Sequence, residues 1–208
     1  MKTDNHYERA FAHYLQYLEI PYLATRENQR CFAGNQEYGS LKNIDFLVFN
    51  RRNSRFILEP EVVAAPRPNG SSLPGALNGF SEEPHAKDVR ISWLIDIKGR
   101  RFPSGQKSPQ YWRNWVNEDD LLSINRWEAL LGTDFHGLLV FAYHVLADRS
   151  PIERSRLFLN EGNYYAFMAI PATVYSRCCR TLSPRWRTLT MPSVEFRKKV
   201  QPIQNWLE

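Results

Sequence analysis

The run from Trp93 to Phe102, WLIDIKGRRF, constrains the fold more than any other part of the chain. Its apolar residues predict a strand near the centre of a sheet, yet it carries Asp96 and Lys98 two positions apart. Residues two apart on a strand point to the same face, so this pair should lie side by side while Ile95 and Ile97 pack on the other face. Because burial of an unpaired charge is unfavourable, the strand predicts either an ion pair or a functional site.

The segments around this strand predict an α/β protein. Helices are expected over residues 6–18, 118–131 and from about residue 193 onward, and strands over residues 22–25, 44–49, 90–99, 138–145 and 164–170. Residues 56–58 are a candidate hairpin partner for the 44–49 strand. This order predicts one domain over residues 1–208, with a mixed central β-sheet flanked by helices. Residues 60–87 contain five prolines and three glycines and predict a flexible surface insertion.

The positive charge of the chain is concentrated in a basic C-terminal segment, residues 149–208. That segment has 10 Lys and Arg against 4 Asp and Glu, whereas residues 1–148 have 17 against 18. Its cations alternate with Tyr175, Trp186 and Phe196, a mixture that suits phosphate contact and base stacking. A solvated surface above core aromatics is the alternative interpretation.

Several protein classes lose support from the sequence. No run approaches the ~18 apolar residues of a membrane span, and the first ten residues lack the apolar core of a signal peptide, so the expected location is the cytoplasm. The three cysteines have no CxxC spacing, which argues against a zinc site or a disulfide framework. No P-loop or GxGxxG motif is present.

Acidic residues on three segments predict a charged cluster. Asp45 stands among apolar residues of the 44–49 strand, and Glu8 lies on the flank of the first helix beside its apolar stripe. These carboxylates and Asp96 would repel one another unless a cation lay among them, and oxygen ligands suit Mg²⁺. Lys98 could then position or deprotonate an attacking water, or stabilise charge on a phosphoryl group. The alternative is an Asp96–Lys98 or Asp45–Lys98 ion pair that only organises the sheet.

The acids Asp119 and Asp120 have a simpler explanation. They fall in the first turn of the 118–131 helix, where the helix dipole favours negative charge. They are therefore interpreted as helix-stabilising residues.

The arrangement resembles the PD-(D/E)XK nuclease superfamily, whose pattern is a glutamate on the first helix, an aspartate on the second strand and (D/E)-x-K on the third. Glu8, Asp45, and Asp96 with Lys98 match it. The segments HYERAFAHYL (6–15), LKNIDFLVF (41–49) and IDIKGRRF (95–102), and later EDDLLSINRWEALLG, LLVFAYHV and SPRWRTL, look more closely like the HYExAFE proteins. The resemblance covers nearly the whole chain apart from residues 60–87. It departs at Ala12, where the HYExAFE motif ends in glutamate, and at Asp96, where glutamate is commoner.

The resemblance implies a restriction-endonuclease-like core and a metal-dependent hydrolase. It implies Mg²⁺, with Mn²⁺ as a substitute, held by Asp45, Asp96, Glu8 and the carbonyl of Ile97. The catalytic set would be Glu8, Asp45, Asp96 and Lys98. Nucleic acid would be the partner, with DNA favoured, although the residues themselves leave DNA and RNA open; they also leave open whether the chain is a monomer or a homodimer.

Five basic residues are expected to contact nucleic acid. Arg100 and Arg101 leave the end of the motif strand, and Arg185, Arg187 and Lys198 belong to the basic C-terminal segment. Two functions other than a nuclease remain open: a catalytically inactive nucleic-acid-binding module of the same fold, and a structural or partner-binding protein whose acids are tied up in ion pairs.

Overall fold

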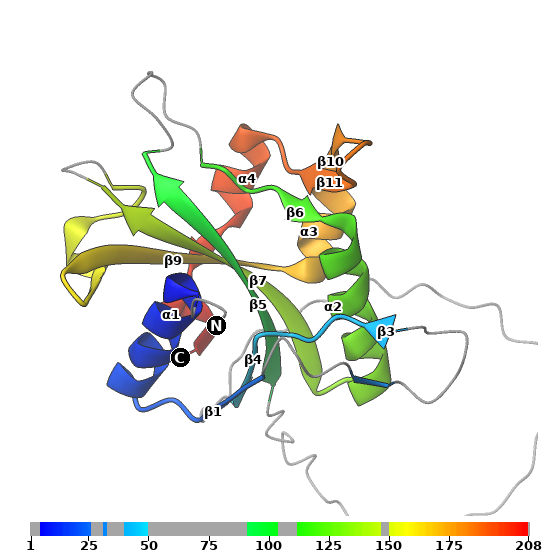
Figure 1. Ribbon diagram of the computed structural model, residues 1–208, viewed down its shortest axis with the longest axis horizontal. Coiled ribbons are helices and arrows are strands. Elements are labelled where there is room, and N and C mark those ends of the chain that lie inside the picture. The colour runs from blue at the N-terminus through cyan, green and yellow to red at the C-terminus, as the bar shows by residue number, and fades with distance from the viewer. Residues whose placement is uncertain are drawn as a thin grey trace, which may run out of the picture.

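The computed structural model describes residues 5–25, 31–32, 40–49, 91–103, 112–146 and 150–207 (Figure 1). The helices are α1 (His6–Tyr17), α2 (Glu118–Leu131), the 3₁₀ turn η2 (Arg154–Arg156), α3 (Ala172–Cys178), α4 (Ser193–Lys199) and α5 (Gln204–Leu207). The strands are β1 (Tyr22–Ala24), β2 (Cys31–Phe32), β3 (Ser40–Leu41), β4 (Phe46–Phe49), β5 (Ser92–Phe102), β6 (Val116–Asn117), β7 (Phe135–Val145), β8 (Phe158–Asn160), β9 (Asn163–Pro171), β10 (Arg180–Ser183), β11 (Thr188–Thr190) and β12 (Gln201–Pro202). The predicted hairpin partner at 56–58 and the predicted insertion at 60–87 lie outside the described residues.

The main sheet is mixed, as predicted. Its strand order is β1-β4-β5-β7-β9-β12, with β8 added beside β9. β5 runs antiparallel to β4 and parallel to β7, and β7 runs antiparallel to β9. The pairing of β5 with β7 extends from Ser92 opposite Phe135 to Phe102 opposite Val145. The apolar motif strand therefore lies in the middle of the sheet.

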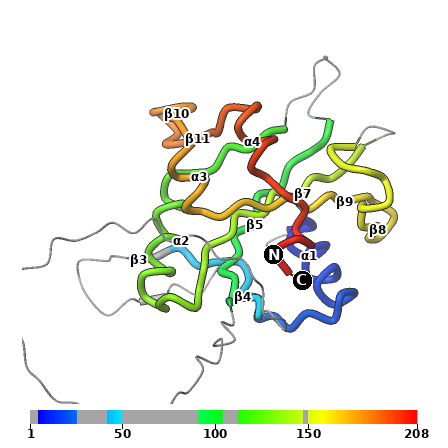
Figure 2. Tube along the Cα trace, turned by 180° about the vertical axis from the view of Figure 1, so that it is seen from behind, coloured from blue at the N-terminus to red at the C-terminus, as the bar shows by residue number. Residues whose placement is uncertain are grey.

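Helices cover both faces of the sheet, and alternate residues of β5 belong to different cores. On one face, Phe11 and Leu15 of α1 pack with Ile95 and Ile97 of β5. On the other face, Leu94 packs in the core that contains buried residues of α2, α3 and α4. Figures 1 and 2 show α1 on one side of the sheet and α2, α3 and α4 on the other. Asp96 and Lys98 follow Leu94 by two and four residues on the strand, so their side chains point to the same face as Leu94, toward α2.

The ends of the two longer helices follow their capping residues. The side-chain oxygen of Asn5 accepts a hydrogen bond from the Tyr7 N–H at 3.2 Å, so Asn5 is the N-terminal cap of α1. α2 ends before Gly132, whose φ of +90° is readily available to glycine and whose N–H donates to the Glu128 carbonyl at 3.0 Å.

Within the described residues, no helix has both the length and the apolar character needed to cross a membrane.

Several features differ from the sequence predictions, among them β6, β8 and β12, which were not predicted strands. The strand predicted over 44–49 begins at Phe46, because Asp45 leaves the regular ladder and uses its side chain to accept a backbone hydrogen bond. α3 was not among the predicted elements. Nor was the hairpin of β10 and β11, which forms a separate three-stranded sheet with β6 in the order β10-β11-β6.

Candidate active site

Asp45 is held beside β5 at the point where β4 begins. The regular pairing of β4 with β5 ends at Phe46 opposite Ile95. One residue earlier, the Asp45 N–H donates to the Ile95 carbonyl at 2.9 Å, and Asp45 Oδ2 accepts from the Ile97 N–H at 2.6 Å. The side chain thus replaces a backbone acceptor of the ladder, and its carboxylate is fixed against the strand that carries Asp96.

Lys98 bridges two carboxylates on the α2 side of the sheet. Its Nζ lies 2.6 Å from Asp96 Oδ2 and 2.6 Å from Asp120 Oδ2. The three side chains are only 10 to 13% exposed. The prediction that Asp96 and Lys98 lie side by side is confirmed, and Asp120 joins them from the first turn of α2.

Asp120 was interpreted from the sequence as a helix-stabilising residue, but it points inward and pairs with two lysines. Besides Lys98, it contacts Lys42, whose Nζ lies 2.7 Å from Asp120 Oδ1. A sequence signal for this was present, because Asp120 precedes Ile124 and Trp127 by four and seven residues and so falls on the inward stripe of the helix. Its neighbour Asp119 is half-exposed and behaves as an ordinary first-turn acid.

The segment before β4 lies along α2 and closes the site from that side. The Lys42 N–H donates to Ser123 Oγ at 3.3 Å, and Trp127 Nε1 donates to the Lys42 carbonyl at 2.9 Å. A small pocket remains between this segment, β5 and α2, lined by Lys42, Asn43, Ile44, Asp96, Asp120, Ser123 and Ile124. The Asp96 carboxylate therefore forms part of a pocket wall.

Glu8 acts on the site from α1. It stands in the first turn of that helix, where Asn5 Nδ2 donates to Glu8 Oε1 at 2.5 Å. Its negative charge is one of the causes that raise the pKa of Asp45. Glu8 therefore acts on Asp45, whereas Asp96 and Lys98 lie together on the α2 side of the sheet.

The carboxyls of Asp45 and Asp96 both have raised pKa values. Burial raises the pKa of Asp45 well above its ordinary value, and the charges of Asp96 and Glu8 raise it further, against the opposing effect of the Ile97 N–H. Burial also raises the pKa of Asp96, although Lys98 opposes the shift. A carboxyl whose pKa is raised by burial and by other acids is one that a nearby cation would stabilise as its anion.

Lys98 and Asp120, in contrast, both stay charged at neutral pH. Burial lowers the pKa of Lys98, but Asp96 and Asp120 outweigh this effect and raise the pKa to about 12. Burial raises the pKa of Asp120, but Lys98 and Lys42 outweigh it, so the net shift is downward. Lys98 is therefore an ammonium and Asp120 a carboxylate throughout the neutral range.

These residues form what we call the charged cluster: Glu8, Asp45, Asp96, Asp120, Lys42 and Lys98. Its four acids outnumber its two lysines. Carboxylate oxygens, and backbone carbonyls such as that of Ile97, are the donors that Mg²⁺ prefers, so the donor set fits this ion chemically. Within the described ranges, however, no three acidic, histidine or cysteine side chains are already gathered closely enough to share a metal.

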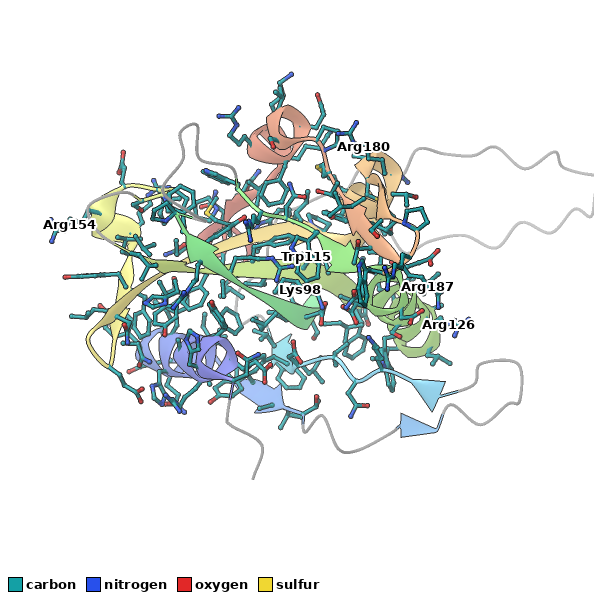
Figure 3. All side chains as sticks on the ribbon, turned by 45° about the horizontal axis from the view of Figure 1, so that its top comes forward. Lys98, Trp115, Arg126, Arg154, Arg180 and Arg187 are labelled. Atoms are coloured by element: carbon teal, nitrogen blue, oxygen red, sulfur yellow. The ribbon has the colours of Figure 1, made fainter. Side chains whose placement is uncertain are left out.

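Arg100 makes contacts inside the protein. It is half-buried, its Nη1 donates to the Gly99 carbonyl at 2.7 Å, and its Nη2 donates to the Trp115 carbonyl. Its guanidinium also lies 4.0 Å from the centre of the ring of Trp115, which is labelled in Figure 3. These contacts use the side chain internally and do not favour the predicted role of Arg100 in binding nucleic acid.

The other four predicted nucleic-acid contacts lie on the surface. Arg101 is exposed on β5. Arg185 lies in the turn between β10 and β11, with its guanidinium 5.3 Å from the centre of the Trp186 ring. Arg187, 57% exposed, pairs with two acids of α2, and Lys198, 68% exposed, lies 3.7 Å from Glu195 on α4.

No protein-family model, curated protein or solved structure gives a significant match to this chain. The mixed α/β sheet flanked by helices is what the structure establishes about the fold class. The similarity to HYExAFE proteins and to PD-(D/E)XK nucleases, including a restriction-endonuclease-like core, stays a prediction from the sequence motifs.

Proposed function

We propose that this chain is a metal-dependent nuclease that hydrolyses phosphodiester bonds in nucleic acid, with DNA as the favoured substrate. The observation that carries the proposal is the position of Asp45. Its half-buried carboxylate lies against β5, where burial and then the charges of Asp96 and Glu8 raise its pKa, and Lys98 lies on the same face as Asp96. Acids gathered in this way are stabilised by a divalent cation.

In this proposal the acids hold the metal and Lys98 acts on the phosphate. Asp45, Asp96, Glu8 and the Ile97 carbonyl would hold Mg²⁺, or Mn²⁺ in its place; the ion would supply positive charge where the phosphoryl group develops negative charge. Lys98, with a pKa of about 12, is protonated at neutral pH. It is therefore suited to stabilise negative charge or to orient water, and not to remove a proton from it.

Asp120 gives Lys98 a fixed position in this scheme. Because Asp120 Oδ2 lies 2.6 Å from Lys98 Nζ, the ammonium would still have a partner if Asp96 served as a metal ligand. Asp120 is thus a positioning residue, and it acts through Lys98.

A second candidate is a nucleic-acid-binding or structural protein in which the ion pairs only organise the sheet. The observation in its favour is the continuous chain of contacts from Lys42 through Asp120 and Lys98 to Asp96, which already gives both lysines partners. The two candidates differ in whether metal and Lys98 are needed for cleavage.

A cleavage assay separates them. Purified protein is incubated with labelled single-stranded, double-stranded and branched DNA and RNA, in Mg²⁺, in Mn²⁺ and in chelator. We expect metal-dependent cutting that falls by roughly 10²- to 10³-fold or more in Lys98→Ala and Asp96→Asn, the scale for losing one group that stabilises developing charge. Glu161→Gln is the control, because this acid is 52% exposed and pairs with Arg9 on the surface. Cutting that persists in chelator, or in both site variants, would refute the proposal.

A further inference from the structure

The hairpin of β10 and β11 presents an aromatic ring among cations. Trp186, in its turn, is 70% exposed, although tryptophan is usually largely buried. Residues 162–194 contain four arginines and no aspartate or glutamate. Two of these arginines, Arg180 and Arg185, are exposed on the hairpin itself. The surface therefore combines an exposed aromatic ring with positive charge.

The hairpin is fixed to the protein on its other side. β11 pairs with β6, with Leu189 opposite Val116, and the Glu118 N–H donates to the Arg187 carbonyl at 2.9 Å. The Arg187 side chain lies 3.0 Å from both Glu118 Oε2 and Asp119 Oδ1. These contacts hold the turn in place, so Trp186 is presented from an ordered support.

The same helical turn connects the hairpin with the charged cluster. Glu118 and Asp119 bind Arg187 on the outside of α2, and Asp120 binds Lys98 on the inside. Along the helix axis these acids are separated by only about 3 Å. Figure 3 labels Lys98 on the central sheet and Arg187 beside α2. A chain that lay across the hairpin would pass beside the end of α2 that carries Asp120.

The chemistry of this surface matches an unpaired nucleotide. An aromatic ring stacks on the face of a base, and arginines bind the phosphates on either side of it. The bases of a duplex already have both faces stacked on their neighbours, whereas those of a single strand are free to stack on an aromatic side chain. The arrangement of Arg185 over Trp186 leaves the ring in the solvent-exposed turn, where such a base could reach it.

We propose that the β10–β11 hairpin binds unpaired nucleotides, with Trp186 stacked on a base and Arg180 and Arg185 on phosphates. This inference rests on the proposed function and deepens it, because it assigns single-stranded nucleic acid, or an unpaired segment next to a duplex, as the substrate class. It also assigns specificity to residues outside the motif strands.

The test measures binding in chelator, where no metal-dependent cutting takes place. A dye-labelled 12-nucleotide oligothymidine and a blunt duplex of equal length are titrated with the full chain, and the dissociation constants are read from fluorescence anisotropy. Trp186→Ala should weaken binding of the single strand by roughly 5- to 150-fold, the range for loss of one stacked base. Trp186→Phe should retain most of the affinity. Leu182→Ala is the matched control, since Leu182 is 55% exposed on the same hairpin but has no ring to stack.

Each outcome decides the question. Tighter binding of the single strand than of the duplex, lost in Trp186→Ala and kept in the control, supports the hairpin as the binding element even when no substrate is cut. Equal affinity of Trp186→Ala and the wild type, or equal affinity for both oligonucleotides, overturns the inference and leaves the proposed nuclease activity standing on its own assay.

Discussion

Replacing Lys98 by methionine removes the centre of the ion-pair network with little change in side-chain volume. The ammonium lies 2.6 Å from both Asp96 Oδ2 and Asp120 Oδ2. Its loss leaves two carboxylates that are 13% and 10% exposed without their shared cation. Removing one partner of a buried ion pair lowers the free energy of unfolding by about 3–5 kcal/mol. We expect about 3 kcal/mol, the low end of that range, because Lys42 still pairs with Asp120.

The same structure predicts how this effect depends on pH. The pKa of Lys98, ordinarily 10.5, is lowered by burial but raised more strongly by Asp96 and Asp120, to about 12. A group whose pKa is higher in the folded state stabilises that state fully below its unfolded pKa and loses the contribution as pH rises through its folded pKa. The stability that the Lys98 ammonium contributes to the wild type should therefore be fully present at neutral pH and be lost between pH 10.5 and 12.

Urea unfolding followed by circular dichroism, repeated at several pH values, measures both the loss in free energy of unfolding and its dependence on pH. The control is Lys42→Met, which removes a second ammonium from the same aspartate. Because Lys42 is 51% exposed, we expect that variant to lose only about 0–1 kcal/mol. Equal losses in the two variants, or a Lys98→Met protein as stable as the wild type, would refute the account of Lys98 as a buried, doubly paired ammonium.

Three further outcomes are expected. Gly99→Ala should lose about 1–3 kcal/mol in urea unfolding, because a Cβ at this position would collide with the ring of Tyr7; unchanged stability would show that α1 does not pack there. Asn114→Ala should lose about 2 kcal/mol or more, measured as a lower midpoint in thermal unfolding, because its buried amide makes three hydrogen bonds at the end of β11. Asp120→Asn should lower the pKa of Lys98, measured by lysine-selective NMR, and should reduce any metal-dependent cleavage; a titration unchanged from wild type would contradict the pairing.

The parts of the fold that follow short-range patterns could be predicted from the sequence. The apolar spacing of residues 6–18 predicts α1 to within one residue of its observed end. The alternation in WLIDIK predicts that Asp96 and Lys98 share a face, and the structure confirms it. These features depend on neighbours along the chain, and one sequence contains that information.

The remaining parts depend on contacts between distant residues. α3 has only seven residues, and its Thr173 and Val174 are β-branched and poor helix formers, so packing of Ala172 and Tyr175 in the core must stabilise it. The internal use of Arg100 depends on the carbonyl and ring of Trp115, fifteen residues away.

The candidate site also has one part that short-range patterns predict and one part that depends on contacts between distant residues. Asp96 and Lys98 could be placed by strand alternation alone. The partners of Asp120 come from positions 42 and 98, and nothing local to α2 indicates them except the helical stripe on which the acid lies. The same holds for Arg187, whose pairing with Glu118 connects the hairpin to α2 only in the folded chain.

The central claim is that the acids around Asp45 bind a divalent cation, and Mn²⁺ binding tests it most directly. Electron paramagnetic resonance of free Mn²⁺, titrated with wild type, Asp45→Asn and the control Asp119→Asn, counts the ions bound. Asparagine retains the acceptor for the Ile97 N–H, so Asp45→Asn should keep the local strand geometry while it removes one negative charge. The account predicts one bound ion in wild type and control, and weakened or abolished binding in Asp45→Asn. Absence of binding in the wild type, or equal binding in all three proteins, would contradict it.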